Sequence, residues 1–196
     1  MRVESVIISD FYNNVDEVRE FALSQEFGVK GNFPSFRTKP FLNDNIKKVI
    51  EDTIQPLSGN ITWLVDEYTG AFQYTTAKDR SWIHVDQITQ WAGVLYLTPF
   101  APVSSGTGLF KHKLTNWTTE PYFDNGEINE NLKNLIYEDA HDMTKWDMQA
   151  MVGNIFNRLV LYRANQWHQS LDYFGNDVND GRLFMTFFFN TRHTPR

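Results

Sequence analysis

The chain has 196 residues, of which 41% are hydrophobic and 15% aromatic, enough apolar material to close one sizeable core. A formal net charge of -6 at pH 7 argues against a nucleic-acid partner, and the absence of cysteine excludes disulfides, thiolate metal sites and cysteine nucleophiles. Any bound metal must therefore use His, Asp or Glu ligands.

Targeting and membrane signals are missing from the sequence. No stretch reaches the roughly 18 consecutive apolar residues that a membrane helix needs, and the opening residues MRVESVIISDFYNN lack the segments of a signal peptide. We therefore expect a cytoplasmic protein without a membrane segment, folded as a single domain over residues 1–196.

Helical periodicity is clearest in two segments near the N-terminus. Val15, Val18, Ala22 and Leu23 recur at helical spacing after Asn14, which predicts a helix of about three turns. A second helix is predicted after Asn43, in NDNIKKVIEDTIQ, with Pro56 as its stop. Residues 1–60 are thus expected to form a helical support beside a sheet.

From Ile61 onward, short aromatic and β-branched runs replace the helical pattern, and turn residues separate them. The seven runs are ITWLVDEY, AFQYTT, SWIHVD, WAGVLYLTP, GTGLFKHK, NRLVLY and RLFMTFFFN. They predict a mainly β fold with flanking α-helices, a jelly roll or sandwich over residues 61–192. Residues 115–150 break the pattern and are predicted to be an insertion over a site, with LKNLIYEDA as a short helix.

A histidine and a carboxylate lie two residues apart in SWIHVDQ. On an extended strand, His84 and Asp86 project from the same face and can reach one ion. His168 follows the apolar run NRLVLY, where a jelly roll returns the chain beside the first pair. Two histidines and one carboxylate predict the facial triad of non-haem Fe(II) oxygenases, which leaves positions open for a co-substrate and O2.

An arginine opens the very apolar run RLFMTFFFN. Alternation places Arg182, Phe184, Thr186 and Phe188 on one face of this strand and only apolar side chains on the other. A cation in such surroundings needs a partner, and a buried anion is the natural one. The mixed face is expected to border a cavity, and the apolar face to pack on helices.

These motifs resemble the Fe(II)/2-oxoglutarate dioxygenase superfamily, whose signature is H-x-D, a distal His, and an Arg or Lys on a following strand. The resemblance is strongest to the prolyl-hydroxylase-like branch. It runs over residues 80–190 through HVD, GVLYLTP, GTGL, RLVLYRANQWHQS and RLFMTFFFN. It implies a double-stranded β-helix (cupin-like) core.

The resemblance also implies site roles. His84, Asp86 and His168 would bind Fe(II), and Arg182 would pair with the distal carboxylate of 2-oxoglutarate, with Thr186 and Tyr96 as hydrogen-bond donors. The charges of Fe(II), Asp86, 2-oxoglutarate and Arg182 sum to zero, so the cluster can be buried. Consumption of 2-oxoglutarate and O2 would then hydroxylate a C–H bond of a peptide side chain or small molecule, with release of succinate and CO2.

Two further histidines, His112 and His141, lie outside the predicted triad. His112 follows Asp86 closely and is flanked by lysines, which predicts a surface or substrate-side residue, and His141 lies in an acidic, exposed segment.

The whole chain is also compatible with a non-catalytic, metal-binding jelly roll of the cupin type, which would have no need of Arg182. A nucleic-acid demethylating oxygenase would share the triad but would need a basic groove.

Overall fold

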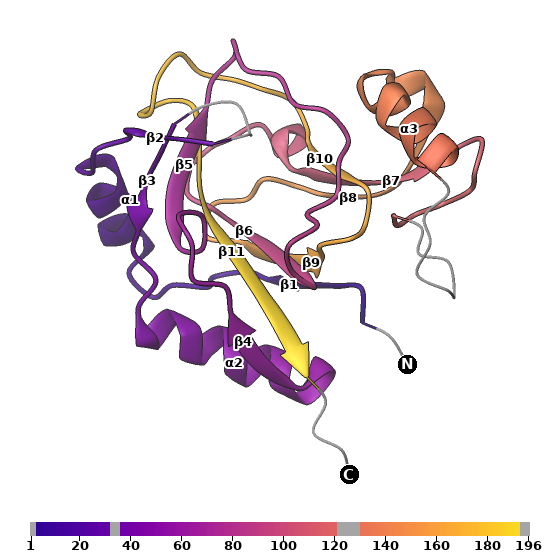
Figure 1. Cartoon of the computed structure of the whole chain (residues 1–196). Coiled ribbons are helices and arrows are strands. Elements are labelled where there is room, and N and C mark those ends of the chain that lie inside the picture. The colour runs from indigo at the N-terminus through magenta and orange to yellow at the C-terminus, as the bar shows by residue number, and fades with distance from the viewer. Residues whose placement is uncertain (1–2, 32–35, 121–129, 193–196) are drawn as a thin grey trace.

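The computed structural model describes residues 3–31, 36–120 and 130–192 (Figure 1). Its helices are α1 (Val15–Leu23), α2 (Asp44–Ser58) and α3 (Glu130–Glu138), with 3-10 turns η1 (Val103–Ser105), η2 (Asp139–His141) and η3 (Met143–Lys145). Its strands are β1 (Ser5–Ile8), β2 (Val29–Lys30), β3 (Phe36–Pro40), β4 (Asn60–Trp63), β5 (Ala71–Thr75), β6 (Trp91–Tyr96), β7 (Thr107–His112), β8 (Trp146–Val152), β9 (Leu159–Arg163), β10 (His168–Ser170) and β11 (Arg182–Arg192). No helix in these ranges is long and apolar enough to cross a membrane.

Two antiparallel sheets carry the architecture. The large sheet has the order β1-β9-β6-β11-β5-β3-β2, with β4 paired to the far end of β11, and the small sheet has the order β10-β7-β8. A buried apolar cluster joins them, because β6, β9 and β11 of the large sheet share it with Val152 of β8 and Leu109 of β7. The two sheets therefore face each other.

The long strand β11 organises the core, and its alternation confirms the prediction from the sequence. Leu183, Met185, Phe187 and Phe189 join Ile50 and Ile54 of α2 in one cluster. On the opposite face, Phe184, Thr186 and Phe188 border a cavity between the sheets. One strand thus supplies both the helix-packing face and the cavity floor.

Both N-terminal helices form where the periodicity predicts them, and they lie beside the large sheet (Figure 1). The predicted stop at Pro56 is wrong, because α2 continues to Ser58. Proline removes only one donor this close to the helix end, and Gly59 N–H still closes the last turn on the carbonyl of Gln55 at 2.9 Å. Burial of Ile54 and Ser58 on one face holds the extra turn in place.

The segment SWIHVD is not a strand, which corrects the prediction for that run. Its backbone groups bond to three separate places: Ile83 N–H to Ala140 O, His84 N–H to His168 O, and Asp86 N–H to Ala164 O. Because these hydrogen bonds go to three different segments, the run forms no continuous ladder with any one strand. Only an isolated bridge links His84 to His168. The segment is nevertheless fixed by these three backbone hydrogen bonds.

Several strands were not predicted, namely β1, β2, β3, β8 and β10. The first three place part of the N-terminal 60 residues within the large sheet. Strand β8 lies at the end of the segment predicted to be an insertion, and its central residues are exposed, so no alternation marks it. Residues 121–129 of that segment lie outside the described ranges, and LKNLIYEDA forms α3 and η2.

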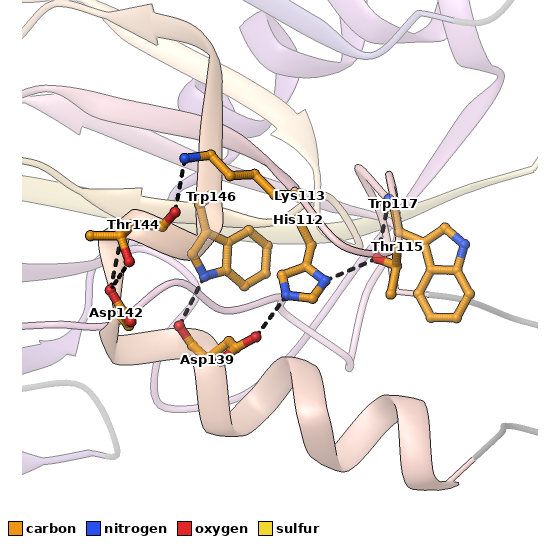
Figure 2. Close-up of polar contacts among 8 residues, drawn as sticks. All are labelled: His112, Lys113, Thr115, Trp117, Asp139, Asp142, Thr144 and Trp146. Carbon is orange, nitrogen blue, oxygen red and sulfur yellow. Dashed lines mark hydrogen bonds and ion pairs between the residues drawn. The ribbon is translucent and has the colours of Figure 1, made fainter.

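His112 is fully buried and does not belong to the cavity lining. Of the two positions predicted for it, surface or substrate side, the surface position is therefore wrong. It lies on β7 between Lys111 and Lys113, and alternation sends the lysines out and the imidazole in. Figure 2 shows its ring between two partners: Nδ1 lies 3.0 Å from Thr115 Oγ1 and Nε2 lies 3.0 Å from Asp139 Oδ2. Asp139 directly follows α3, so this contact anchors the end of α3 on the small sheet.

Replacing His112 by alanine is expected to lower the free energy of unfolding by about 2–4 kcal/mol, because it opens a cavity and leaves Asp139 without its buried partner. Urea unfolding followed by circular dichroism measures the change. Lys111→Ala is the matched control on the same strand, since its ion pair with Asp147 at 3.7 Å is partly exposed. Equal stability of the two variants would show that the His112 contact does not anchor α3.

Candidate active site

Three side chains from two distant segments meet between the sheets. His84 and Asp86 lie on the connection from β5 to β6, and His168 is the first residue of β10. Reciprocal backbone hydrogen bonds of 2.9 Å between His84 and His168 hold the two segments together. One ligand atom from each of the three side chains lies within 4.8 Å of the others, a spacing suited to a single metal ion.

Both imidazoles are oriented by backbone carbonyls two residues earlier in the chain. Nδ1 of His84 lies 2.9 Å from Trp82 O, and Nδ1 of His168 lies 2.8 Å from Gln166 O. Because a carbonyl can only accept, each Nδ1 carries a hydrogen, so Nε2 is the ring atom that becomes a metal ligand when the imidazole is neutral. Nε2 of His168 lies 3.3 Å from Oδ2 of Asp86. The two imidazoles and the carboxylate thus converge on one point.

The local environment sets the protonation states that metal binding requires. Burial, together with the neighbouring His168, lowers the pKa of His84 to about 4. Burial alone would raise the pKa of Asp86, but the charge and hydrogen bond of His168, with the charge of His84, lower it instead. At neutral pH the site therefore offers a neutral His84 and an ionised Asp86, as metal ligands must be.

Arg182 is buried with part of its donor capacity unused. Its side chain has 0% exposure, and only Nε is bonded, to Ser105 O at 2.9 Å. Within the described residues, Nη1 and Nη2 have no hydrogen-bond partner. The guanidinium carbon lies 4.5 Å from the ring centroid of Phe184. A buried cation with two free, parallel N–H groups suits a carboxylate ligand.

The hydroxyls predicted to accompany Arg182 lie in different places. Tyr96 is fully buried and shares a 2.7 Å hydrogen bond with Thr107, and its ring centroid lies 5.3 Å from the guanidinium carbon of Arg182. Burial raises the pKa of Tyr96 although the charge of Arg182 acts against it. Thr186 instead donates to the carbonyl of Tyr68 at 2.6 Å. Tyr96 therefore lies next to Arg182, whereas the hydroxyl of Thr186 is engaged elsewhere.

A cavity of about 600 Å³ opens at the metal-binding cluster. It is lined by the metal-binding cluster, by the inner faces of both sheets and by Lys133 and Tyr137 of α3. Thr107 borders it, whereas Tyr96 and Arg182 do not belong to its lining. The volume is within the range of small-molecule sites.

Some residues at the site escaped prediction from the sequence. Thr107 lines the cavity and shares a hydrogen bond with Tyr96, and the ring centroid of Tyr162 lies 4.7 Å from that of His168. Alternation on β9 would have placed Tyr162 with Val160 on the inner face. Thr107 carried no signal of this kind, because its importance depends on its pairing with Tyr96.

Comparison with known families identifies the chain. A family model described as a family of unknown function, DUF6445, matches residues 2–189. The chain belongs to the DUF6445 family. A search of curated proteins finds no match.

Solved structures show which fold this DUF6445 member has. A prolyl hydroxylase from Trichoplax adhaerens, in complex with a hypoxia inducible factor peptide fragment, aligns with a TM-score of 0.53 and 11% identity over 95% of this chain and 83% of its own. HygX from Streptomyces hygroscopicus, with nickel, 2-oxoglutarate and hygromycin B bound, aligns with a TM-score of 0.53 and 12% identity over 96% and 83%. The 2-oxoglutarate-dependent carbocyclase SnoK from nogalamycin biosynthesis gives 0.55 and 12% over 95% and 79%.

These alignments confirm the predicted fold class. The chain has the jelly-roll fold of the Fe(II)/2-oxoglutarate oxygenases, mainly β with flanking helices. At such low identity, the likeness concerns the fold. The chemistry must be argued from the residues of this chain.

Proposed function

We propose that this DUF6445 protein is an Fe(II)- and 2-oxoglutarate-dependent dioxygenase that hydroxylates a C–H bond of a small molecule or peptide side chain. The observation that carries the proposal is the combination, in one oxygenase-like fold, of the triad His84, Asp86 and His168 with the unpaired Nη groups of the buried Arg182. The triad alone would suit several divalent metals, and the arginine alone would suit any small anion. Together they fit a metal and a dicarboxylate.

The residues present fit both groups. His84, Asp86 and His168 would hold the metal from one side, so the positions facing the cavity stay open to a co-substrate and O2. Arg182 would bind the distal carboxylate through Nη1 and Nη2, beside the hydroxyls of Tyr96 and Thr107. Thr186 lines the cavity, and the role implied for its hydroxyl remains a prediction.

When bound, Fe(II) with 2-oxoglutarate and O2 supplies the oxidant: one oxygen atom enters the substrate C–H bond, and the other enters succinate as CO2 leaves. The protein would bind and orient the substrates and would exclude water from the cavity. The backbone contacts of Trp82 and Gln166 keep the imidazoles aimed at the metal. The apolar rings of Phe184 and Phe188 line the cavity, so they keep its wall dry.

A metal-binding jelly roll without oxygen chemistry accounts for the site less well. Such a protein would need the triad but would have no use for a buried arginine with two unfilled donors. Burying that charge costs free energy unless an anion accompanies it.

Thermal unfolding in the presence of 2-oxoglutarate tests the proposal. We expect 2-oxoglutarate to raise Tm in the presence of Mn(II) and to have little effect on the metal-free protein, because chelation contributes to its binding. Glutarate, which has both carboxylates but no keto group, is the matched control and should give a smaller shift. Equal shifts with the two dicarboxylates, or none in any arm, would contradict a chelated co-substrate.

A further inference from the structure

A second buried arginine lines the cavity from β3, which lies next to the edge strand β2 of the large sheet. Arg37 on β3 is 4% exposed and belongs to the cavity lining. Among the residues that the structure describes, Nε of Arg37 has no hydrogen-bond partner. Burial lowers its pKa. A largely desolvated cation with an unbonded Nε–H favours an anionic ligand.

The register of the large sheet fixes where Arg37 points. Arg37 pairs with Gln73 on β5, and Gln73 pairs with Phe184 on β11. Directly paired residues share one face of a sheet, and Gln73 and Phe184 both line the cavity. Arg37 therefore lies on the inner face, two strand spacings, or roughly 10 Å, from β11. This places it across the cavity floor from the strand that carries Arg182.

Two contacts that involve no hydrogen bond hold the guanidinium of Arg37 in place. Its carbon lies 4.3 Å from the ring centroid of Tyr68, which also lines the cavity. The guanidinium of Arg37 also packs against Gly31, where an added Cβ would collide with Nη2 of the arginine. The aromatic face and the glycine restrict the side chain, so a ligand would meet a pre-oriented fork.

The neighbouring charges indicate the kind of anion. Asp66 also lines the cavity and, with Glu67, lies near enough to act on Arg37 through its charge. Oδ1 of Asp66 accepts hydrogen bonds from the backbone N–H groups of Tyr68 and Thr69, which fixes the carboxylate there. A doubly charged phosphate would be repelled by Asp66 more than a singly charged carboxylate.

We propose that Arg37 is a substrate-binding residue and that the substrate of this enzyme carries a carboxylate, which pairs with Arg37 while the C–H bond to be oxidised faces the metal. This inference rests on the proposed function for the identity of the reaction. Carboxylate binding at Arg37 does not depend on the proposed function. Because the cavity must also hold 2-oxoglutarate, about 600 Å³ leaves room for a small carboxylic acid or one end of a larger one.

The test observes Arg37 directly. In protein loaded with redox-inert Zn(II) and saturating 2-oxoglutarate, the Nε–H resonance of Arg37 is assigned by its loss in Arg37→Lys. Propionate is then titrated to about 100 mM, because one carboxylate contact corresponds to millimolar affinity. We expect a saturable shift of this resonance with propionate, no saturable shift with propionamide, and weaker binding of inorganic phosphate.

The outcomes separate this inference from the proposed function. A resonance that does not respond to propionate, responds equally to propionamide, or prefers phosphate would overturn the carboxylate site. The Tm shift with 2-oxoglutarate and Mn(II) is recorded on the same preparation. If the Tm shift is present and the Arg37 resonance does not respond, only the carboxylate-site inference is rejected. If the Arg37 resonance responds and the Tm shift is absent, the dioxygenase proposal is rejected. Calorimetry of propionate with Arg37→Gln, where binding heat should be lost, gives a second readout.

Discussion

Replacing Arg182 by lysine is expected to weaken 2-oxoglutarate binding about 10- to 100-fold. The structure leaves Nη1 and Nη2 of Arg182 free, while Nε is already bonded to Ser105 O. Lysine keeps the charge but loses the planar fork that gives a carboxylate two parallel hydrogen bonds. Loss of one charge-assisted hydrogen bond costs about 1.5–3 kcal/mol, which corresponds to the stated range. Titration of 2-oxoglutarate into the Mn(II)-loaded protein measures it.

The fold of the Arg182 variant needs its own control, because the side chain is fully buried. Arg80→Lys is the matched substitution: Arg80 is exposed and bonds only to carbonyls within its own turn, those of Ala77 and Asp79. It should bind 2-oxoglutarate like the unmodified protein. An unchanged affinity in Arg182→Lys, with cooperative unfolding retained, would reject Arg182 as the anchor.

Replacing His168 by alanine is expected to reduce metal affinity by at least about 100-fold and to abolish turnover. His168 is the ligand that connects the two segments of the triad, and its Nε2 lies 3.3 Å from Asp86 Oδ2. With only His84 and Asp86 left, the metal would lose one of three protein ligands, a larger loss than the roughly 10- to 100-fold typical of outer-shell partners. Equilibrium dialysis with Mn(II) measures the affinity.

His141→Ala is the control for that substitution. His141 is exposed, and its ring centroid lies 5.9 Å from that of Trp82, so it is near the site without belonging to the cluster. Its removal should leave metal affinity unchanged. Comparable losses in the two variants would indicate that the metal does not bind at the triad.

Much of the fold follows from local patterns in the sequence. The alternation in β11 predicts both a helix-packing face and a cavity face, and both are present. The H-x-D spacing predicts that His84 and Asp86 share a face, and the structure brings them together with His168. These features could be predicted because side-chain direction along an extended chain has a period of two.

The remaining features depend on tertiary pairing. The backbone around His84 divides its hydrogen bonds among three neighbours, which no local pattern reveals. His112 resembled a surface residue because its lysine neighbours are charged, yet Asp139, distant in sequence, makes burial tolerable. Arg37 and Thr107 join the cavity only through the register of their strands. Such partners are set by the whole chain and not by a window of it.

An anaerobic titration of the metal-free protein with Fe(II) and 2-oxoglutarate tests the central claim most directly. We predict a visible charge-transfer band that forms only when both are present and is missing in His168→Ala, because chelation requires the metal to be held by His84, Asp86 and His168. No band in the intact, folded protein would contradict the account and would favour a jelly roll without dioxygenase chemistry.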